Sequence, residues 1–382
     1  LSGEEYDLGE RIHSFAGGLP PGVPVGSSPT LNIPGTVLPG EYHVLVFIDS
    51  DNSIEETNEN NNIAASTTTY TISNQVTSLS GQTVDQFSGV PLAGVAVESS
   101  VGSTVSDANG NFTIDLGSMM DVLTFQRSGS FTRQTFAQQD LSDWRMIPSS
   151  FDMALFDEGA RGHTSPREPG RTYIWTEGDP NVYIDETEYD YPTAEASDSV
   201  IPHIGTYVDL WTDGRLSPNS ISTGISPPAD GEHGSIIIRF EDLSEYNWDE
   251  DGNTIYVLGR CKVWYYENTY EIVSALVRLD FAQRPDANME WILGHEFGHA
   301  FGMAHFNRDR AFMMREVTPL PGTPFSDFEG LVANILYSRL PGSRSPDIED
   351  PAISGVSAQD RGPLVVAEWV DLYKEPETER RR

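Results

Sequence analysis

The chain has 382 residues, of which 38% are hydrophobic and 21% charged, and its formal net charge is −35. This length predicts two to four domains. The 58 acidic against 23 basic residues argue against nucleic-acid binding. The acidity is spread along the whole chain, as is typical of a soluble, salt-tolerant or calcium-rich extracellular surface.

Cysteine content and hydropathy exclude further classes of protein. Cys261 is the only cysteine, so no intrachain disulfide can form, and within GRCKVWYY we interpret it as a buried apolar side chain. No stretch approaches the ~20 apolar residues that a membrane span needs. The start, LSGEEYDLGE, is not a signal peptide, so we expect the numbering to begin inside a longer precursor.

Residues 1–76 are predicted to be all-β, with the clearest strand at Tyr42–Ile48. The segment GEYHVLVFIDSDNSIEETNENNN resembles the end of a CARDB module, a cell-adhesion-related β-sandwich. The resemblance implies a partial sandwich over residues 1–76 whose first strands are missing.

Two interpretations stay open for the acidic loop after this strand. Asp49, Asp51 and Glu55 either bind Ca²⁺ or belong to a solvated hairpin loop. The spacing is not that of an EF-hand, because Ile54 occupies the position that requires glycine.

Residues 77–155 carry a second all-β pattern, in which short strands alternate with turns. The turn Asp107–Gly110 predicts a hairpin, because Asn-Gly between β-prone runs is a strong hairpin signal. The pattern resembles a carboxypeptidase-regulatory-like β-sandwich, which implies an accessory module without activity of its own. Both modules are interpreted as able to bind cell-surface or matrix ligands. Residues 156–171 are polar and rich in Pro and Gly, and predict a linker.

From residue 172 the pattern changes to alternating strands and helices, which predicts a new domain over residues 172–342. The expected strands are Tyr173–Trp175, Val182–Ile184, Ser235–Phe240, Thr254–Tyr266 and Ile272–Phe281. The expected helices span Val200–Trp211 and Ala287–Phe301.

The run HEFGHAFGMAH, which begins in the second of these helices and extends beyond its end, contains three histidines at metal-ligand spacing. His295 and His299 are four apart and share a helix face, with Glu296 beside them. A continued helix would carry His305 ~9 Å along the axis. The chain must therefore turn back, and Gly302 is the residue best suited to end the helix. The alternative is an ordinary helical histidine pair plus a loop histidine.

Three neutral histidines leave one tetrahedral position of Zn²⁺ open, which indicates a catalytic site. Such zinc activates a water molecule, and Glu296 is the candidate general base that takes its proton. The predicted metal ligands are His295, His299 and His305. We assign no role to His163, His203 or His233.

The motif resembles the metzincin clan of zinc metalloproteases, whose signature HExxHxxGxxH is filled at every position. The clan has a methionine turn beneath the metal, and RAFMMREV supplies Met313 for it, with Met314 as the second choice. Arg315 stands where some members have a tyrosine ligand, and no PRCGxPD-type cysteine switch is present.

The three resemblances together imply the fold class: two all-β sandwich modules, then a metzincin-type α+β or α/β catalytic domain with a twisted mixed sheet and an active-site helix. The metzincin resemblance also implies an edge strand that pairs with an extended substrate, and Leu258–Trp264 is the candidate. A plain interior strand is the alternative interpretation of that segment.

A capping box at Ser326–Glu329 predicts a further helix that ends near Pro341–Gly342. Residues 343–382 are expected to form a partly disordered C-terminal extension with one strand at Leu364–Trp369.

These observations together predict a secreted or cell-surface zinc metalloendopeptidase acting on protein or peptide substrates. Two alternatives stay open. One is a cell-surface adhesion or binding protein with a degenerate metzincin scaffold, and the other is a zinc amidase acting on non-protein amides.

Overall fold

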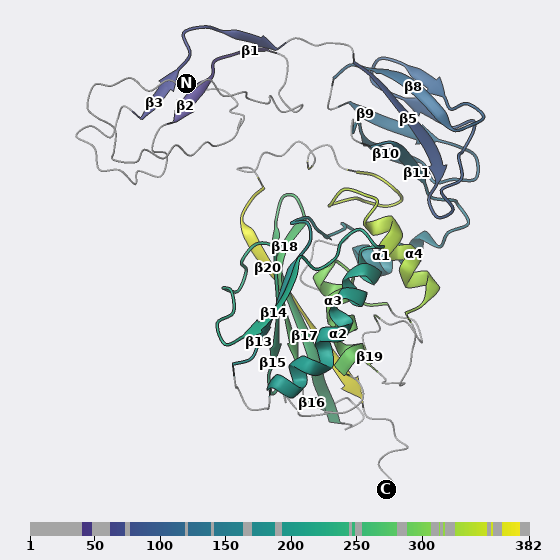
Figure 1. The fold of residues 1–382 in the computed structure, drawn as a ribbon. Helices are drawn as coiled ribbons and strands as arrows, with labels where there is room; N and C mark the ends of the chain where they lie inside the picture. The colour runs from purple at the N-terminus through teal and green to yellow at the C-terminus, as the bar shows by residue number, and fades with distance from the viewer. Residues whose placement is uncertain are drawn as a thin grey trace.

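The computed structural model describes residues 40–47, 62–72, 77–118, 121–138, 141–162, 170–187, 193–243, 247–248, 254–280, 289–306, 313, 316–317, 325–349, 353 and 361–374. Over these residues the chain is β-rich, multidomain and poor in helix, with both parallel and antiparallel pairing (Figure 1). The expectation of a multidomain, mostly β chain is thus confirmed. No described helix is both long and apolar enough to cross a membrane. The proposed calcium loop lies outside the described residues.

The first module contributes four short strands: β1 (Gly40–Tyr42), β2 (Leu45–Phe47), β3 (Ile63–Ala65) and β4 (Tyr70–Ile72). β1 pairs with β4 and β2 with β3, both antiparallel. The predicted strand at Tyr42–Ile48 is therefore interrupted. At the break, Val44 donates its N–H to Ser66 Oγ at 3.0 Å, and its carbonyl accepts from Ser66 N at 2.8 Å.

The second module packs two sheets face to face. Its strands are β5 (Thr77–Asp85), β6 (Ala96–Glu98), β7 (Ser103–Val105), β8 (Asn111–Leu116), β9 (Val122–Gln126), β10 (Arg133–Phe136) and β11 (Asp143–Met146). The orders are β10-β9-β6-β7 and β11-β5-β8. Buried residues alternate with exposed ones along β8, and Phe125 stacks on Trp144 between the sheets.

The prediction of a hairpin at Asp107–Gly110 is wrong, because the two flanking strands join different sheets. β7 pairs with β6, whereas β8 pairs with β5. The turn itself is present: Gly110 N donates to Asp107 O at 3.0 Å, and the Asp107 carboxylate accepts from two backbone N–H groups. A tight turn is a local property, whereas the strands' partners depend on the rest of the module.

A nine-stranded mixed sheet forms the centre of the next domain. Its strands are β12 (Ile174–Trp175), β13 (Asn181–Asp185), β14 (Ser220–Gly224), β15 (Ser235–Phe240), β16 (Asn247–Trp248), β17 (Thr254–Tyr266), β18 (Glu271–Leu279), β19 (Glu316–Val317) and β20 (Leu364–Lys374). The order is β14-β13-β15-β18-β17-β20-β19, with β12 on β18 and β16 on β17. Strand β20 belongs to this sheet although it lies beyond residue 342.

Four helices are described: α1 (Met153–Arg161), α2 (Thr193–Trp211), α3 (Met289–Ala300) and α4 (Asp327–Leu336). α3 contacts β17, β18 and α2, and from Ile292 to Ala300 it is buried on all sides (Figure 1). The predicted capping box of α4 is present, with Ser326 and Glu329 bonded reciprocally. α1 was not predicted, and it extends into the segment interpreted as a linker.

Buried charges connect the second module to the segment that follows α4. Arg339 binds both carboxylate oxygens of Asp347, at 2.6 and 2.8 Å, and both side chains are fully buried. Arg133 of β10 lies 3.4 Å from Glu349. Burial and the neighbouring Arg339 lower the pKa of Arg133 to about 10, against the opposing effect of Glu349 and Asp347. The Arg133–Glu349 pair, shielded from water, thus joins the two parts of the chain, while the Arg339–Asp347 pair lies within the later of them.

Candidate metal centre

His295 and His299 lie on α3, one helical turn apart and both almost completely buried. The helix is held in place on its other side, where Trp211 of α2 donates its indole N–H to the Gly294 carbonyl at 2.7 Å. The four-residue spacing therefore places both imidazoles on one face, as the sequence predicts.

Gly302 ends the helix and turns the chain back. Its φ is +102°, in the region that favours glycine, and its N–H donates to the His299 carbonyl at 3.1 Å. A Cβ at this position would lie 2.0 Å from the Tyr173 carbonyl oxygen. Glycine is thus required here both for conformation and for space.

His305 is positioned by backbone contacts on both of its sides. Ala304 donates its N–H to the Gly159 carbonyl of α1 at 2.6 Å, and Phe306 donates to the Met313 carbonyl at 2.7 Å. A Cβ on Gly159 would overlap the Phe306 ring, at 1.8 Å. The close approach of α1 therefore helps to locate the third histidine. Nothing in the sequence alone indicates this role, because the contact joins residues about 145 positions apart.

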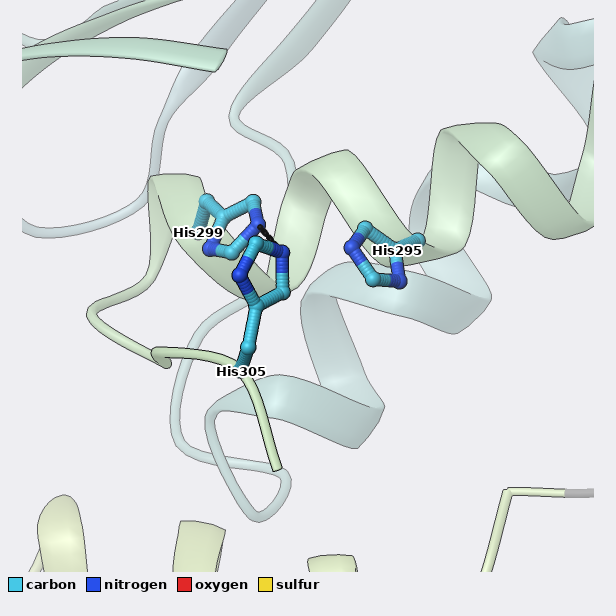
Figure 2. A group of neighbouring side chains, drawn as sticks. All are labelled: His295, His299 and His305. Carbon is cyan, nitrogen blue, oxygen red and sulfur yellow. Dashed lines mark hydrogen bonds between the residues drawn. The ribbon is translucent and has the colours of Figure 1, made fainter. Parts of the chain in front are cut away.

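The three imidazole rings converge (Figure 2). Each offers one nitrogen, and these nitrogens all lie within 4.8 Å of one another. Nε2 of His299 is 3.1 Å from Nε2 of His305. Two nitrogens that share a tetrahedral zinc at ~2.0–2.1 Å lie about 3.3 Å apart, so this separation fits a common metal ion.

The tautomer of His299 also fits a metal ligand. Its Nδ1 lies 2.9 Å from the Met303 carbonyl, which can only accept a hydrogen bond. Nδ1 therefore carries the proton, and the lone pair is left on Nε2, which faces the other two histidines. A carbonyl in this position orients the ring and raises its basicity. The group of three histidines could hold a metal ion.

Glu296 is completely buried and lies against β17. A Cβ on Gly259 of β17 would lie 2.0 Å from Oε1 and 2.7 Å from Cδ of Glu296. Only glycine at residue 259 therefore leaves room for this carboxylate. No local sequence pattern links Gly259 to Glu296, so only the tertiary structure reveals this contact.

Met313 lies beneath α3. A Cβ on Gly298 would be 2.3 Å from the Met313 sulfur, so the thioether packs directly on the helix next to His299. Met313 N donates to Oε1 of Glu329 at 2.8 Å, and Oε2 of the same carboxylate accepts from Ser326 N at 3.1 Å. Glu329, which caps α4, thus also holds the backbone of Met313. The sequence alone did not indicate this second contact. Met314 and Arg315 lie outside the described residues.

Trp369 of β20 is a further site residue that the sequence did not reveal. Its ring stacks on His299, with centroids 4.9 Å apart and an interplanar angle of 10°. The remaining described histidines of the domain lie elsewhere: His203 contacts Glu290 at 3.2 Å, and His233 contacts Glu177 at 3.4 Å. Neither belongs to the group of three. His163 lies outside the described residues.

Comparison with known proteins gives one family match and one structural likeness of interest. The CARDB family model matches residues 21–66, so the resemblance of the first module is confirmed over that range. Comparison with curated proteins gives no match. Among solved structures, metalloproteinase-II from Bacteroides fragilis is similar at 12% sequence identity over 72% of this chain and 89% of that chain, with a TM-score of 0.24. That TM-score does not establish a common fold.

Proposed function

We propose that the chain is a secreted or cell-surface zinc endopeptidase in which His295, His299 and His305 hold the metal. The observation that carries this proposal is the convergence of three imidazole nitrogens within 4.8 Å, two of them from a helix that also bears a buried carboxylate and the third from the turn that follows it. Three neutral nitrogens are a donor set that zinc favours, and they leave room for a further ligand. The motif's likeness to the metzincin signature, with Met313 packed beneath the helix, supports the same assignment.

Bound zinc would supply a Lewis acid that polarises a carbonyl and lowers the pKa of water to ~7. The chain's own residues would supply the rest. Glu296 would accept the proton of the attacking water and return it to the departing amine nitrogen. His299 would be kept in its Nε2 lone-pair tautomer by the Met303 carbonyl. Burial would keep bulk water from competing for the carboxylate.

Metal content and chelator sensitivity test this function together. We expect one zinc per chain by elemental analysis, and cleavage of a mixed peptide library that a zinc chelator stops and added zinc restores. The His299→Ala variant should lose both the bound zinc and the cleavage activity, because it lacks one of the three ligands. His233→Ala, which changes an exposed histidine outside the group, should lose neither. Cleavage that persists without metal would exclude a zinc peptidase.

The position of Glu296 depends on Gly259, which leads to a separate prediction. Gly259→Ala should push the carboxylate aside, because the new Cβ would overlap its oxygen. We expect cleavage to fall about 10²-fold, as a misplacement of roughly 1 Å can cause, while zinc content stays unchanged. Gly205→Ala, where no atom lies within 4 Å of the added Cβ, is the matched control. Equal activity of the two variants would show that Glu296 does not need this space.

The CARDB match favours a second candidate, namely a surface protein that binds a ligand and in which the zinc domain has lost its activity. The zinc amidase is a variant of the first proposal with a different amide as substrate. Stoichiometric zinc without cleavage of any peptide would favour the binding protein. Zinc-dependent hydrolysis of non-peptide amides alone would favour the amidase.

A further inference from the structure

Strand β17 has partners on both of its long sides. The segment Leu258–Trp264 was expected to be a free edge that pairs with substrate, with an interior strand as the alternative. The interior strand is what the structure contains: β18 pairs with β17 on one side and β20 on the other, both antiparallel (Figure 1). Pairing with β20 extends from Ile255↔Lys374 to Tyr266↔Leu364, with one irregularity between Val257 and Gly259.

Strand β20 is also held on its far side. β19, which follows Met313 along the chain, pairs parallel with it through Glu316↔Leu372 and Val317↔Tyr373. β20 therefore lies between the strand that contacts Glu296 and the strand that follows the methionine beneath the metal centre. An extended segment in this position passes directly over the candidate site.

The inner face of β20 covers His299, one of the three histidines. Trp369, opposite Cys261 in the register, is 2% exposed and stacks on His299. Ala367, two residues earlier, is fully buried, whereas Val366 and Val370 on the other face are 45% and 38% exposed. This period of two is that of a strand with one face on the protein and one in solvent.

We propose that β20 occupies the place of an extended peptide substrate, so that the chain keeps its own site closed until β20 is displaced. This inference rests on the proposed peptidase function. Pairing along β17 uses backbone groups, which every peptide has, so β20 and a substrate are alternative ligands of one edge. The side chain that faces His299 is aromatic in β20, which points to substrates with a bulky apolar residue at the matching position.

Because β20 belongs to the same chain as its binding site, it binds there in preference to a peptide in solution. A segment joined to its binding site competes at an effective concentration of roughly millimolar. A free peptide of equal intrinsic affinity would bind well only at that concentration. The closed arrangement therefore predicts low activity towards short peptides, which rises when β20 is released.

A reversible cross-link can test whether β20 must move. Lys262 and Glu368 are direct partners in the register, and their charged groups are 3.8 Å apart and partly exposed. Partners in an antiparallel pair have Cα atoms roughly 4.5–5.5 Å apart, which suits a disulfide. Lys262→Cys with Glu368→Cys in the full chain would lock β20 when oxidised and free it when reduced. Cys261 points to the opposite face of β17, and peptide mapping verifies the intended bond.

We expect the oxidised variant to cleave the peptide library in proportion to the fraction left unlinked, about tenfold slower when nine-tenths is cross-linked. Reduction should restore the rate. The matched control is Thr124→Cys with Gln134→Cys, which joins the partner strands β9 and β10 in the other module. Its oxidation should leave the rate unchanged. Equal rates for the oxidised and reduced forms of the β17–β20 variant would overturn the proposal, because β20 would then be a permanent strand of the sheet.

Binding separates this proposal from the failure of the peptidase function. A fluorescent peptide with the sequence of residues 364–374, titrated to millimolar concentration, should bind the reduced variant and not the oxidised one. If neither form cleaves any peptide, this difference in binding would still support β20 as the occupant of a peptide-binding edge. Equal binding to the two forms, or none to either, would overturn it.

Discussion

Glu296→Gln is expected to abolish peptide cleavage and to leave zinc bound. The substitution keeps the size of the side chain but removes the group that takes a proton, and it changes none of the three histidines. Loss of a general base costs about 10²–10⁴-fold in rate. The measurement is kcat/KM on a peptide substrate, with zinc content determined on the same preparation.

Glu290→Gln provides the matched control for this substitution. Glu290 lies on the same helix, but its side chain is 58% exposed and contacts His203. It should retain the activity of the parent. If the Glu296 variant cleaved peptides as fast as the Glu290 variant, the proton would be moved by another group, and the assignment of Glu296 would be wrong.

Asp347→Asn is expected to cause the largest loss of stability. It leaves the Arg339 guanidinium buried without its bidentate carboxylate. Burial, the largest single effect, lowers the pKa of Arg339, but Asp347 and Glu349 together outweigh it and raise the pKa, with Asp347 contributing most, so this carboxylate makes the buried charge tolerable. Breaking such a pair costs about 3–5 kcal/mol of unfolding free energy.

Urea unfolding followed by tryptophan fluorescence measures this loss, and Asp213→Asn is its control. The Asp213–Arg215 pair is 3.9 Å apart and more than one-third exposed, so its removal should cost less than about 1 kcal/mol. Asparagine also tolerates the positive φ of residue 213. A loss for the Asp347 variant as small as that for Asp213 would contradict a stabilising role for the buried cluster.

The position of β20 and the burial of the histidines have a common consequence for the proposed function. His295, Glu296 and His299 are almost inaccessible, and Trp369 covers one of the three rings. The proposed peptidase activity requires that both water and substrate reach the site, so a site with this burial would need a segment that moves. β20 is the described segment that lies over the site and is also joined to the strand expected to bind substrate.

Several elements could be predicted from the sequence because short-range patterns determine them. The strands Ser235–Phe240 and Thr254–Tyr266 have the expected bounds, since they are apolar or β-branched runs between turn residues. The capping box at Ser326–Glu329 and the histidine pair on α3 follow from the geometry of one helical turn. Other predictions failed where pairing was involved, as at Asp107–Gly110 and at the interrupted strand near Val44.

What the sequence by itself determined is the set of metal-ligand candidates, because His295, His299, Gly302 and His305 lie within eleven residues and local backbone geometry brings them together. Only the tertiary structure decided what surrounds them. Gly259, Gly159, Glu329 and Trp369 reach the site from separate elements. Strands pair through backbone hydrogen bonds, which are the same for every residue type. No pattern in Leu364–Lys374 therefore indicated that this strand would lie against β17 and over His299.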